Sequence, residues 1–347
     1  MVYKNIQALR AFAAFAVLAH HLIFLVTEYI GIGRAPIPFV SFESGVDIFF
    51  VVSGFVMAAS ARQQSPGAFA TARIARIVPL YWLATFTAAF ALLLGFRIFN
   101  LNGFDPEDFA QSLFFLPIFD PAGYAINPIV YVGWSLNYEM LFYALFTVSL
   151  FFPDGWAREN CVFTLIIALI AAGALTQNSF LRYWGNPVIL EFAAGMLIWR
   201  LTQRAVLSKT LAVLAITAGV SALIAAGLWP EWRLATMRVV FYGLPAVLIV
   251  LGFVSLERNG ITLGSGFLQR QGNASYALYL THIFTLQAVG KTSILLGLNQ
   301  SAAGIVLSVA IAGALALFVG TLTHKHVEKP LTAAARRVLT PAQTRAG

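Results

Sequence analysis

The sequence predicts an all-α polytopic membrane protein with about ten transmembrane helices and both termini in the cytoplasm. Of its 347 residues, 59% are apolar and only 10% are charged, whereas a soluble domain carries about 25% charged residues. Apolar segments close to the ~20 residues that cross a bilayer follow one another along almost the whole chain. The Lys and Arg residues gather in alternate loops between these segments, as the positive-inside rule describes.

The predicted spans leave few long connections. The second and sixth predicted spans are the least certain because they contain Asp47 and Glu191. The longest connection, residues 98–128, contains the apolar stretch 112–119, which we expect to form a short helix in the membrane interface. The ten predicted spans are residues 7–28, 42–60, 77–97, 129–152, 160–177, 187–203, 210–229, 235–255, 273–296 and 303–323.

The distribution of basic residues predicts the orientation. With the N-terminus in the cytoplasm, 16 of the 22 Lys and Arg residues fall on the cytoplasmic side and 6 on the other side. Those 6 are Arg34, Arg97, Arg182, Arg233, Arg238 and Lys291. This bias predicts that both termini are cytoplasmic. We expect residues 1–331 to form a single transmembrane domain and residues 332–347 to form a basic, disordered tail.

Cysteine usage and net charge limit the kinds of site and partner that we expect. A single cysteine, Cys161, excludes a disulfide within the chain, and no Cys/His cluster has the spacing of metal ligands. The net charge of +8 reports topology in a membrane protein. We therefore expect the lipid bilayer as a partner, no nucleic acid and no metal.

The first span is apolar but carries Arg10, His20 and His21. On a helix, Arg10 and His21 fall within about 20° of the same face, with His21 roughly 16 Å further along the axis. Polar groups at such depth are costly and usually face a protein interior or a functional cavity. The alternative is an arginine that snorkels to the surface and a histidine that bonds to a neighbouring helix.

The second span and the loop after it supply an acid and two arginines. Asp47 lies on the same helical face as Gly54, and it is either a functional group or the partner of a buried cation. Arg73 and Arg76 are spaced i, i+3 and would share a helix face. Two guanidiniums at the cytoplasmic surface suit a phosphate-rich ligand, although lipid head groups are an alternative.

The fourth span places Ser135, Glu139 and Tyr143 at i, i+4 and i+8, on one stripe of one helix. A carboxylate in hydrocarbon must be paired, neutral or in contact with water. Next to a histidine, Glu139 would hold the ring's tautomer and raise its basicity, as in acyl-transfer triads. A structural pair between Glu139 and an arginine is the alternative.

The ninth span carries a second intramembrane imidazole. Ser275, Tyr279 and His282 lie at i, i+4 and i+7, again on one stripe. Such a histidine is commonly a hydrogen-bonding group between packed helices, so Tyr279 and His282 are candidate rather than assigned site residues.

Six segments of the chain form a recognisable set: LRAFAAFAVLAHH, GVDIFFVVSGFVM, ARIARIVPLYW, WSLNYEMLFY, SYALYLTH and VEKP. Their sequences, order and approximate spacing, from about residue 3 to residue 331, resemble the integral-membrane acyltransferase-3 family. The opening IQALRA and the phrase FFVVSGFVM are most similar to the exopolysaccharide-production acetyltransferases of the succinoglycan type.

The resemblance implies an O-acetyltransferase in the bacterial inner (cytoplasmic) membrane. The acyl group, usually acetyl, would come from acetyl-CoA as co-substrate and go to a hydroxyl of a cell-surface or exported polysaccharide or its lipid-linked precursor. Polysaccharide-synthesis machinery or a second copy of the chain would be the protein partners. Many relatives carry an additional SGNH-type domain, which we do not expect here because the sequence ends soon after the tenth span.

The resemblance also assigns roles residue by residue. Arg10 and His21 match the family's Arg-x10-His motif, which makes His21 the catalytic imidazole and leaves His20 outside the spacing. Arg73 and Arg76 match its Arg-x2-Arg motif, which is expected near the CoA phosphates, with Arg10 at the entrance.

A third motif, Ser-x3-Glu, is matched by Ser135 and Glu139. As our own mechanistic hypothesis, Glu139 orients or charge-balances His21, with Ser135 in support. His21 would act as a general base on the sugar hydroxyl or as a nucleophile through an acetyl-imidazole.

Other functions remain open at this point. The acceptor could be a lipid, a peptidoglycan sugar or a small metabolite instead of a polysaccharide. Polar residues inside a helix bundle also suit a transporter of lipid-linked sugars, although the sequence has no repeated halves. A membrane scaffold would leave the polar stripes of the first and fourth spans without a reason.

Overall fold

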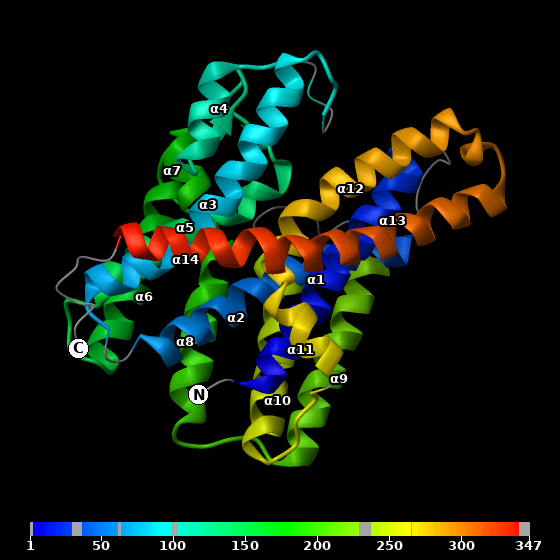
Figure 1. Cartoon of the computed structure of the whole chain (residues 1–347). Coiled ribbons are helices and arrows are strands. Elements are labelled where there is room, and N and C mark those ends of the chain that lie inside the picture. Colours follow the sequence, from blue (N-terminus) through cyan, green and yellow to red (C-terminus); the bar gives the residue numbers. More distant parts are fainter. Residues whose placement is uncertain are drawn as a thin grey trace. The chain divides into compact units, whose positions relative to one another are not determined.

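The computed structural model describes residues 3–29, 37–61, 64–98, 101, 103–228, 237–264 and 266–339 (Figure 1). This part of the chain is helical, apart from the short antiparallel pair β1 (Ile118–Phe119) and β2 (Ala125–Ile126). The all-α prediction is therefore confirmed. The chain divides into two compact units, the first formed by Met1–Val56 with Ala194–His324 and the second by Met57–Ala193 with Lys325–Gly347.

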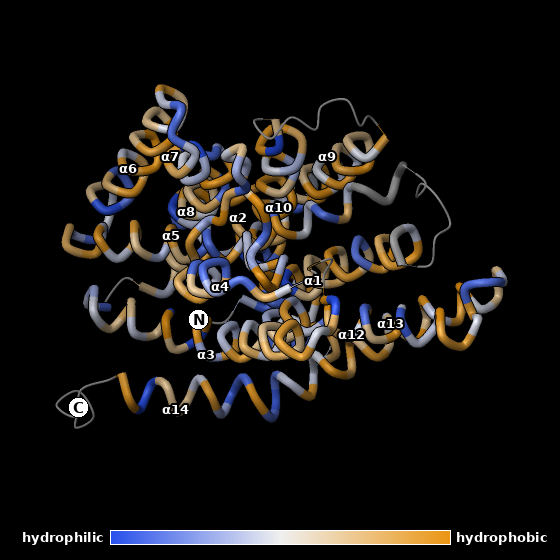
Figure 2. The backbone as a smooth tube through the Cα atoms, turned by 90° about the horizontal axis from the view of Figure 1, so that it is seen from above, coloured by the Kyte–Doolittle hydropathy of each residue, from blue (hydrophilic) through white to orange (hydrophobic). Residues whose placement is uncertain are grey.

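The first unit is built around α1 (Lys4–Phe24), which packs against α10, α11, α12 and α13. Two helix pairs, α9 with α10 and α12 with α13, lie side by side in both Figure 1 and Figure 2. The other elements of the unit are η1 (Leu25–Tyr29), η2 (Ile37–Ser44), most of α2 (Gly45–Ser60), most of α8 (Leu190–Thr202), α9 (Lys209–Leu228), η7 (Val239–Gly243), α10 (Leu244–Arg258), α11 (Gly266–Asn273), α12 (Ser275–Leu295), η8 (Leu298–Gln300) and α13 (Ala302–Thr323).

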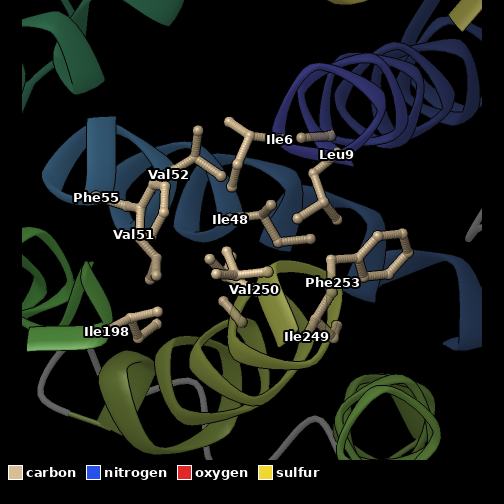
Figure 3. Packing of buried hydrophobic residues seen from close by; sticks show 13 residues of the cluster. Ile6, Leu9, Ile48, Val51, Val52, Phe55, Ile198, Ile249, Val250 and Phe253 are labelled. Carbon is tan, nitrogen blue, oxygen red and sulfur yellow. The ribbon is translucent and has the colours of Figure 1, made fainter. Parts of the chain in front are cut away.

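An apolar cluster joins α1, α2, α8 and α10 within the first unit. Figure 3 shows these side chains pointing toward one another between the helices. Its labelled members are Ile6, Leu9, Ile48, Val51, Val52, Phe55, Ile198, Ile249, Val250 and Phe253, all less than 9% exposed. Their dispersion contacts hold α1 in place against α2 and α10.

Small residues let the helices next to α1 approach closely. A Cβ atom at Gly45 would lie 2.4 Å from the carbonyl oxygen of Ala13, and one at Gly320 would lie 2.9 Å from the Cα of Leu278. Both distances are too short for a side chain, so glycine is what allows α2 to meet α1 and α13 to meet α12. Close contact through glycine is a common way to associate helices in membranes.

The start of α1 is fixed by two polar residues that sequence reasoning did not single out. The Glu257 carboxylate accepts from the backbone N–H groups of Lys4 (2.7 Å) and Asn5 (2.8 Å). A carboxylate at a helix N-terminus satisfies unpaired N–H groups and interacts favourably with the helix dipole. The fully buried Asn5 amide also donates to the carbonyls of Phe253 (3.0 Å) and Ile261 (2.9 Å).

The second unit contains α3 (Pro66–Leu93), which starts eleven residues before the predicted span. Ser65 accepts from the Ala68 N–H and Pro66 occupies the first turn, a common pattern at a helix start. The other elements are the end of α2, α4 (Pro106–Leu113), β1, β2, η3 (Tyr131–Gly133), α5 (Trp134–Ser149), α6 (Trp156–Ala174), α7 (Ser179–Trp184), η4 (Pro187–Ile189), the start of α8, most of η9 (His324–Glu328) and α14 (Lys329–Leu339).

Two expectations about connecting segments are wrong. The helix expected over 112–119 is instead α4, which starts after Asp105, whose carboxylate accepts from the N–H groups of Glu107 and Asp108. The tail expected from residue 332 continues as helix to Leu339 within α14, which packs on α3. In Figure 2, α14 alternates between polar and apolar colours, as an amphipathic surface helix does. Residues 340–347 of the tail lie outside the described residues.

Helices lie at all ten predicted ranges, but the described part of the chain holds seven helical stretches that are long and apolar enough to cross a membrane. The 16-residue α5 and the 13-residue α8 are shorter than a span, and α12 is long enough but less apolar. The seven stretches are Lys4–Thr27, Ser41–Ser60, Pro66–Leu93, Trp156–Ala174, Lys209–Leu228, Val239–Arg258 and Ala302–Leu339. The chain is therefore a multi-pass membrane protein.

Candidate functional site

Arg10 of α1 reaches the start of α12. Its Nη2 donates to the Ser275 hydroxyl at 3.0 Å, and the arginine is half-buried. The contact brings together two of the polar stripes predicted from the sequence. Because His21 and His282 meet further along the same two helices, α1 and α12 run in the same direction through this region.

His21 and His282 face each other across the contact between α1 and α12. The Nε2 atom of His282 lies 3.1 Å from Nδ1 of His21, and the ring centroids are 4.9 Å apart. His282 is only 1% exposed, whereas His21 is half-buried. His20 packs edge-on against His21 with ring centroids 5.0 Å apart. Tyr279 lies beside His282, with a centroid distance of 6.1 Å.

Asp47 is the partner of a half-buried cation, Arg238. Arg238 donates to its two carboxylate oxygens, from Nε at 2.9 Å and from Nη2 at 2.7 Å, and Asp47 is fully buried. Glu43 lies 3.9 Å from the same guanidinium, which also stacks over the ring of Tyr242. The bidentate geometry favours the structural alternative for Asp47 over a role in chemistry.

Arg73 and Arg76 lie inside α3, not in a loop before it. The Arg73 guanidinium stacks over the Phe69 ring at 5.2 Å, and its Nε atom is buried without a hydrogen-bond partner. Arg76 and Arg336 are both within electrostatic range of Arg73. Arg336 comes from α14, so the helix that replaces the expected loose tail adds a third cation to the pair.

Glu139 and Tyr143 of α5 form a pair in the same unit as Arg73. The Tyr143 hydroxyl donates to the Glu139 carboxylate, and both groups are within electrostatic range of Arg73. The Ser135 hydroxyl donates to the Val132 carbonyl at 3.1 Å, one turn earlier. Glu139 thus has Tyr143 as a hydrogen-bond partner and Arg73 within electrostatic range.

The start of α5 is held by a buried amide and two stacked tyrosines. Asn137 donates to the Tyr183 hydroxyl at 3.2 Å, and the rings of Tyr138 and Tyr183 stack with centroids 4.9 Å apart. Burial raises the pKa of Tyr183 to about 12, so its hydroxyl stays protonated and donates to the Trp134 carbonyl at 3.4 Å. These contacts fix the helix that carries Ser135 and Glu139.

The structure groups the predicted residues into two sets. The first unit holds Arg10, His20, His21, Asp47, Ser275, Tyr279 and His282. The second unit holds Arg73, Arg76, Ser135, Glu139 and Tyr143. Among the described residues, no group of three or more His, Cys, Asp or Glu side chains is arranged to hold a metal ion. Sequence reasoning missed Arg336 as a site residue, although the three alanines directly before it favour a helix.

A family model described as an acyltransferase domain matches residues 3–324. The exopolysaccharide production protein ExoZ of Rhizobium meliloti is 37% identical over 295 residues, which cover 83% of this chain and 89% of the relative.

The chain belongs to the acyltransferase-3 family.

More distant relatives have the same character. The acyltransferase MdmB of Streptomyces mycarofaciens is 28% identical over 94% of this chain and 90% of its own length. A membrane-bound transacylase named BcsY in Komagataeibacter xylinus, described as putative, is 28% identical over 69% of this chain and 64% of its own length. No solved structure gave a significant match. The family match covers all of the predicted site residues, from Arg10 to His282.

Proposed function

We propose that this acyltransferase is a membrane O-acetyltransferase that uses cytoplasmic acetyl-CoA. The acceptor is a hydroxyl of a cell-surface or exported polysaccharide or of its lipid-linked precursor, and the enzyme works in the bacterial inner membrane with both termini in the cytoplasm. The observation that carries the proposal is the pair of imidazoles on α1 and α12 within an acyltransferase domain. Histidine is the side chain best suited to exchange protons with a hydroxyl near neutral pH. The similarity to ExoZ supports the acceptor class.

The donor's phosphates are assigned to Arg73 and Arg76, with Arg10 as the third donor-binding residue predicted from the sequence. Arginine binds phosphate through a planar fork of N–H donors. A buried N–H without an acceptor costs about 1–3 kcal/mol, and Arg73 Nε is such a group. A phosphate oxygen of CoA would satisfy it. Arg336 adds positive charge to the same neighbourhood.

In the reaction, His21 takes the proton of the acceptor hydroxyl while the hydroxyl oxygen attacks the thioester carbonyl. A C–O bond forms and the C–S bond breaks. The CoA thiolate that leaves takes the proton from His21, which regenerates the neutral imidazole and releases CoA as a thiol. In the covalent variant, a ring nitrogen of His21 attacks the thioester carbonyl, so that an N–C bond forms, the C–S bond breaks and CoA leaves as a thiolate. The acceptor hydroxyl then attacks the acetyl-imidazole, so that a C–O bond forms and the N–C bond breaks, and the hydroxyl proton passes to the CoA thiolate.

Ser135 and Glu139 stay in the proposal as supporting groups. The contacts of Glu139 with Tyr143 and its closeness to Arg73 favour a specific role. A carboxylate near a guanidinium limits the orientations that the guanidinium adopts, so Glu139 would orient the donor-binding arginine. A role in orienting His21 or balancing its charge, as hypothesised from the sequence, is the alternative.

The acceptor class has a competing form, namely a lipid, peptidoglycan or small-metabolite acceptor. The relative from Streptomyces mycarofaciens, which aligns with 94% of this chain, is named only as an acyltransferase and specifies no acceptor. Both forms predict consumption of acetyl-CoA, which a transporter of lipid-linked sugars would not show.

The test uses purified protein in nanodiscs with acetyl-CoA that carries a labelled acetyl group. Separate reactions receive polysaccharide oligomers, a lipid extract or small hydroxylated metabolites. The proposal predicts label on the oligomers or on lipid-linked sugars, which mass spectrometry detects. Label found only on simple lipids or metabolites would show that the acceptor is not a polysaccharide or its lipid-linked precursor. Intact acetyl-CoA in every reaction would contradict the proposal.

A further inference from the structure

Each of the two facing imidazoles also contacts a backbone carbonyl of its own helix. Nδ1 of His282 lies 3.0 Å from the Leu278 carbonyl oxygen. Nδ1 of His21 lies 2.9 Å from the Val17 carbonyl oxygen and 3.1 Å from Nε2 of His282. Carbonyl oxygens only accept hydrogen bonds, and a neutral imidazole has one N–H donor and one lone-pair acceptor. The contacts therefore restrict where the protons lie.

One arrangement of protons satisfies all of these contacts. The hydrogen on Nδ1 of His282 is donated to Leu278, which leaves a lone pair on Nε2. That lone pair accepts from Nδ1–H of His21, and the Val17 carbonyl accepts from the same hydrogen. A neutral His21 that carries its hydrogen on Nδ1 has its lone pair on Nε2. Placing the hydrogen of His21 on Nε2 instead would set the Nδ1 lone pair against both the Val17 oxygen and the His282 lone pair.

We propose that His282 is a positioning residue that holds His21 in the tautomer with the reactive lone pair on Nε2. The inference rests on the proposed function of His21. Nε2 is then the atom that takes the hydroxyl proton or, in the covalent variant, forms the bond to the acetyl carbon. When Nε2 gains a proton or an acetyl group, His21 becomes positively charged. Its Nδ1–H then donates more strongly to the His282 lone pair.

His282 thus takes the place that a carboxylate has in a Ser-His-Asp triad, but as a neutral group. The site suits a neutral acceptor because His282 is buried within the helix contact at 1% exposure, where an isolated carboxylate would be costly. Gly320 permits α13 to pack directly on α12 at Leu278, which holds the carbonyl that orients His282. The orientation of His21 is therefore set by α12 and α13 as well as by α1.

The proposal predicts a graded series of activities at position 282. His282→Leu removes one of the two acceptors for Nδ1–H of His21 and leaves the Val17 carbonyl. It should lower kcat by about 10- to 100-fold, the effect of removing the orienting partner of a metal-bound histidine. The KM for acetyl-CoA should stay within a factor of about three, because His282 does not bind the donor. His282→Gln places an amide oxygen where Nε2 was, and most of the lost rate should return.

Thr285→Val is the matched control on the same helix. Thr285 lies three residues beyond His282, is buried and donates to the Thr281 carbonyl. Loss of the Thr285 hydroxyl therefore perturbs α12 without removing the partner of His21. Its kcat should stay near that of the wild type. The positioning role is wrong if His282→Leu keeps the wild-type kcat. It is also wrong if His282→Gln and His282→Leu lower kcat equally while the two variants have equal thermal stability.

A spectroscopic measurement tests the tautomer without relying on activity. The protein contains five histidines, so ¹⁵N labelling of histidine gives few ring signals in solid-state NMR of the protein in lipid. His21→Ala identifies the signals of His21 by their loss. The proposal predicts a protonated Nδ1 and an unprotonated Nε2 for His21. In His282→Leu, where the Val17 carbonyl is the acceptor that remains, it predicts a larger share of the tautomer with the hydrogen on Nε2.

Failure of this inference and failure of the proposed function can be told apart. A wild-type protein with the predicted His21 tautomer but no acetyl transfer would refute the function and leave the positioning role intact. An active enzyme whose His21 carries its hydrogen on Nε2 would refute the positioning role alone.

Discussion

The donor-binding role of Arg73 gives the most specific prediction for a single side chain. Its guanidinium stacks on Phe69 and its Nε–H is buried without an acceptor. A charge-assisted hydrogen bond of this kind is worth about 1.5–3 kcal/mol. Arg73→Ala should therefore raise the apparent KM for acetyl-CoA by about 10- to 150-fold, because every 1.4 kcal/mol is a factor of ten.

Two further substitutions rank the contributions. Arg73→Lys keeps the charge but loses the planar fork, so its KM should lie between those of the wild type and Arg73→Ala. Arg336 is exposed on α14 and acts on the donor as a screened surface charge, which is worth up to about 1 kcal/mol. Arg336→Ala should raise KM by less than about fivefold, and the effect should shrink at high salt.

The assay compares two donors, acetyl-CoA and acetyl-pantetheine, which carries the same thioester but no phosphates. The account predicts that Arg73→Ala loses affinity for acetyl-CoA and acts on acetyl-pantetheine as the wild type does. Arg182→Ala is the control in the same unit, since Arg182 bonds only weakly to Gln177 at 3.4 Å. An equal loss with both donors would mean that Arg73 is structural, and no loss with either would refute the phosphate assignment.

Three predictions concern stability, measured as thermal unfolding by tryptophan fluorescence. Arg238→Met should destabilise by about 3–5 kcal/mol because it leaves the fully buried Asp47 uncompensated, and Asp47→Asn should destabilise by less because Arg238 is half-buried. Asp47→Leu combined with Arg238→Met should recover much of the loss, and additive losses would refute the pairing. Asn5→Ala should cost about 3 kcal/mol because buried carbonyls lose their donor, and unchanged unfolding would contradict that. Gly320→Ala should destabilise the protein by about 1–3 kcal/mol through overpacking. Gly313→Ala is the control and should be neutral, because a Cβ there meets only the tip of Leu22 at 3.4 Å. Equal effects of the two substitutions would contradict the close contact of Gly320 with Leu278.

Helix positions could be predicted from the sequence because they depend on local hydropathy. Runs of apolar residues near bilayer length locate helices without knowledge of their neighbours. The predicted helix ends are less accurate where polar or charged residues suggest a loop but the helix start signals and helix-forming residues indicate a helix. Arg73 and Arg76 made the third span appear to begin at 77, although Ser65 and Pro66 form a readable start signal. The charge of the tail predicts disorder, although its alanines and arginines favour a helix.

The contacts of the site could not be predicted in the same way. His21 and His282 are 261 residues apart, and Asp47 and Arg238 are 191 apart. Each stripe of polar residues showed that a helix needed a partner, because polar groups in hydrocarbon must be satisfied. The identity of that partner depends on how the helices pack, which no local pattern contains. The sequence thus named both histidines and Asp47, but the structure was needed to pair them.

The central claim is that His21 carries out acetyl transfer. The most direct measurement is transfer of labelled acetyl from acetyl-CoA to polysaccharide oligomers by wild type, His21→Ala and His326→Ala in nanodiscs. His326 is an exposed histidine outside the proposed site and serves as the control. The account predicts that transfer is lost in His21→Ala and unchanged in His326→Ala. Equal transfer by wild type and His21→Ala would contradict it.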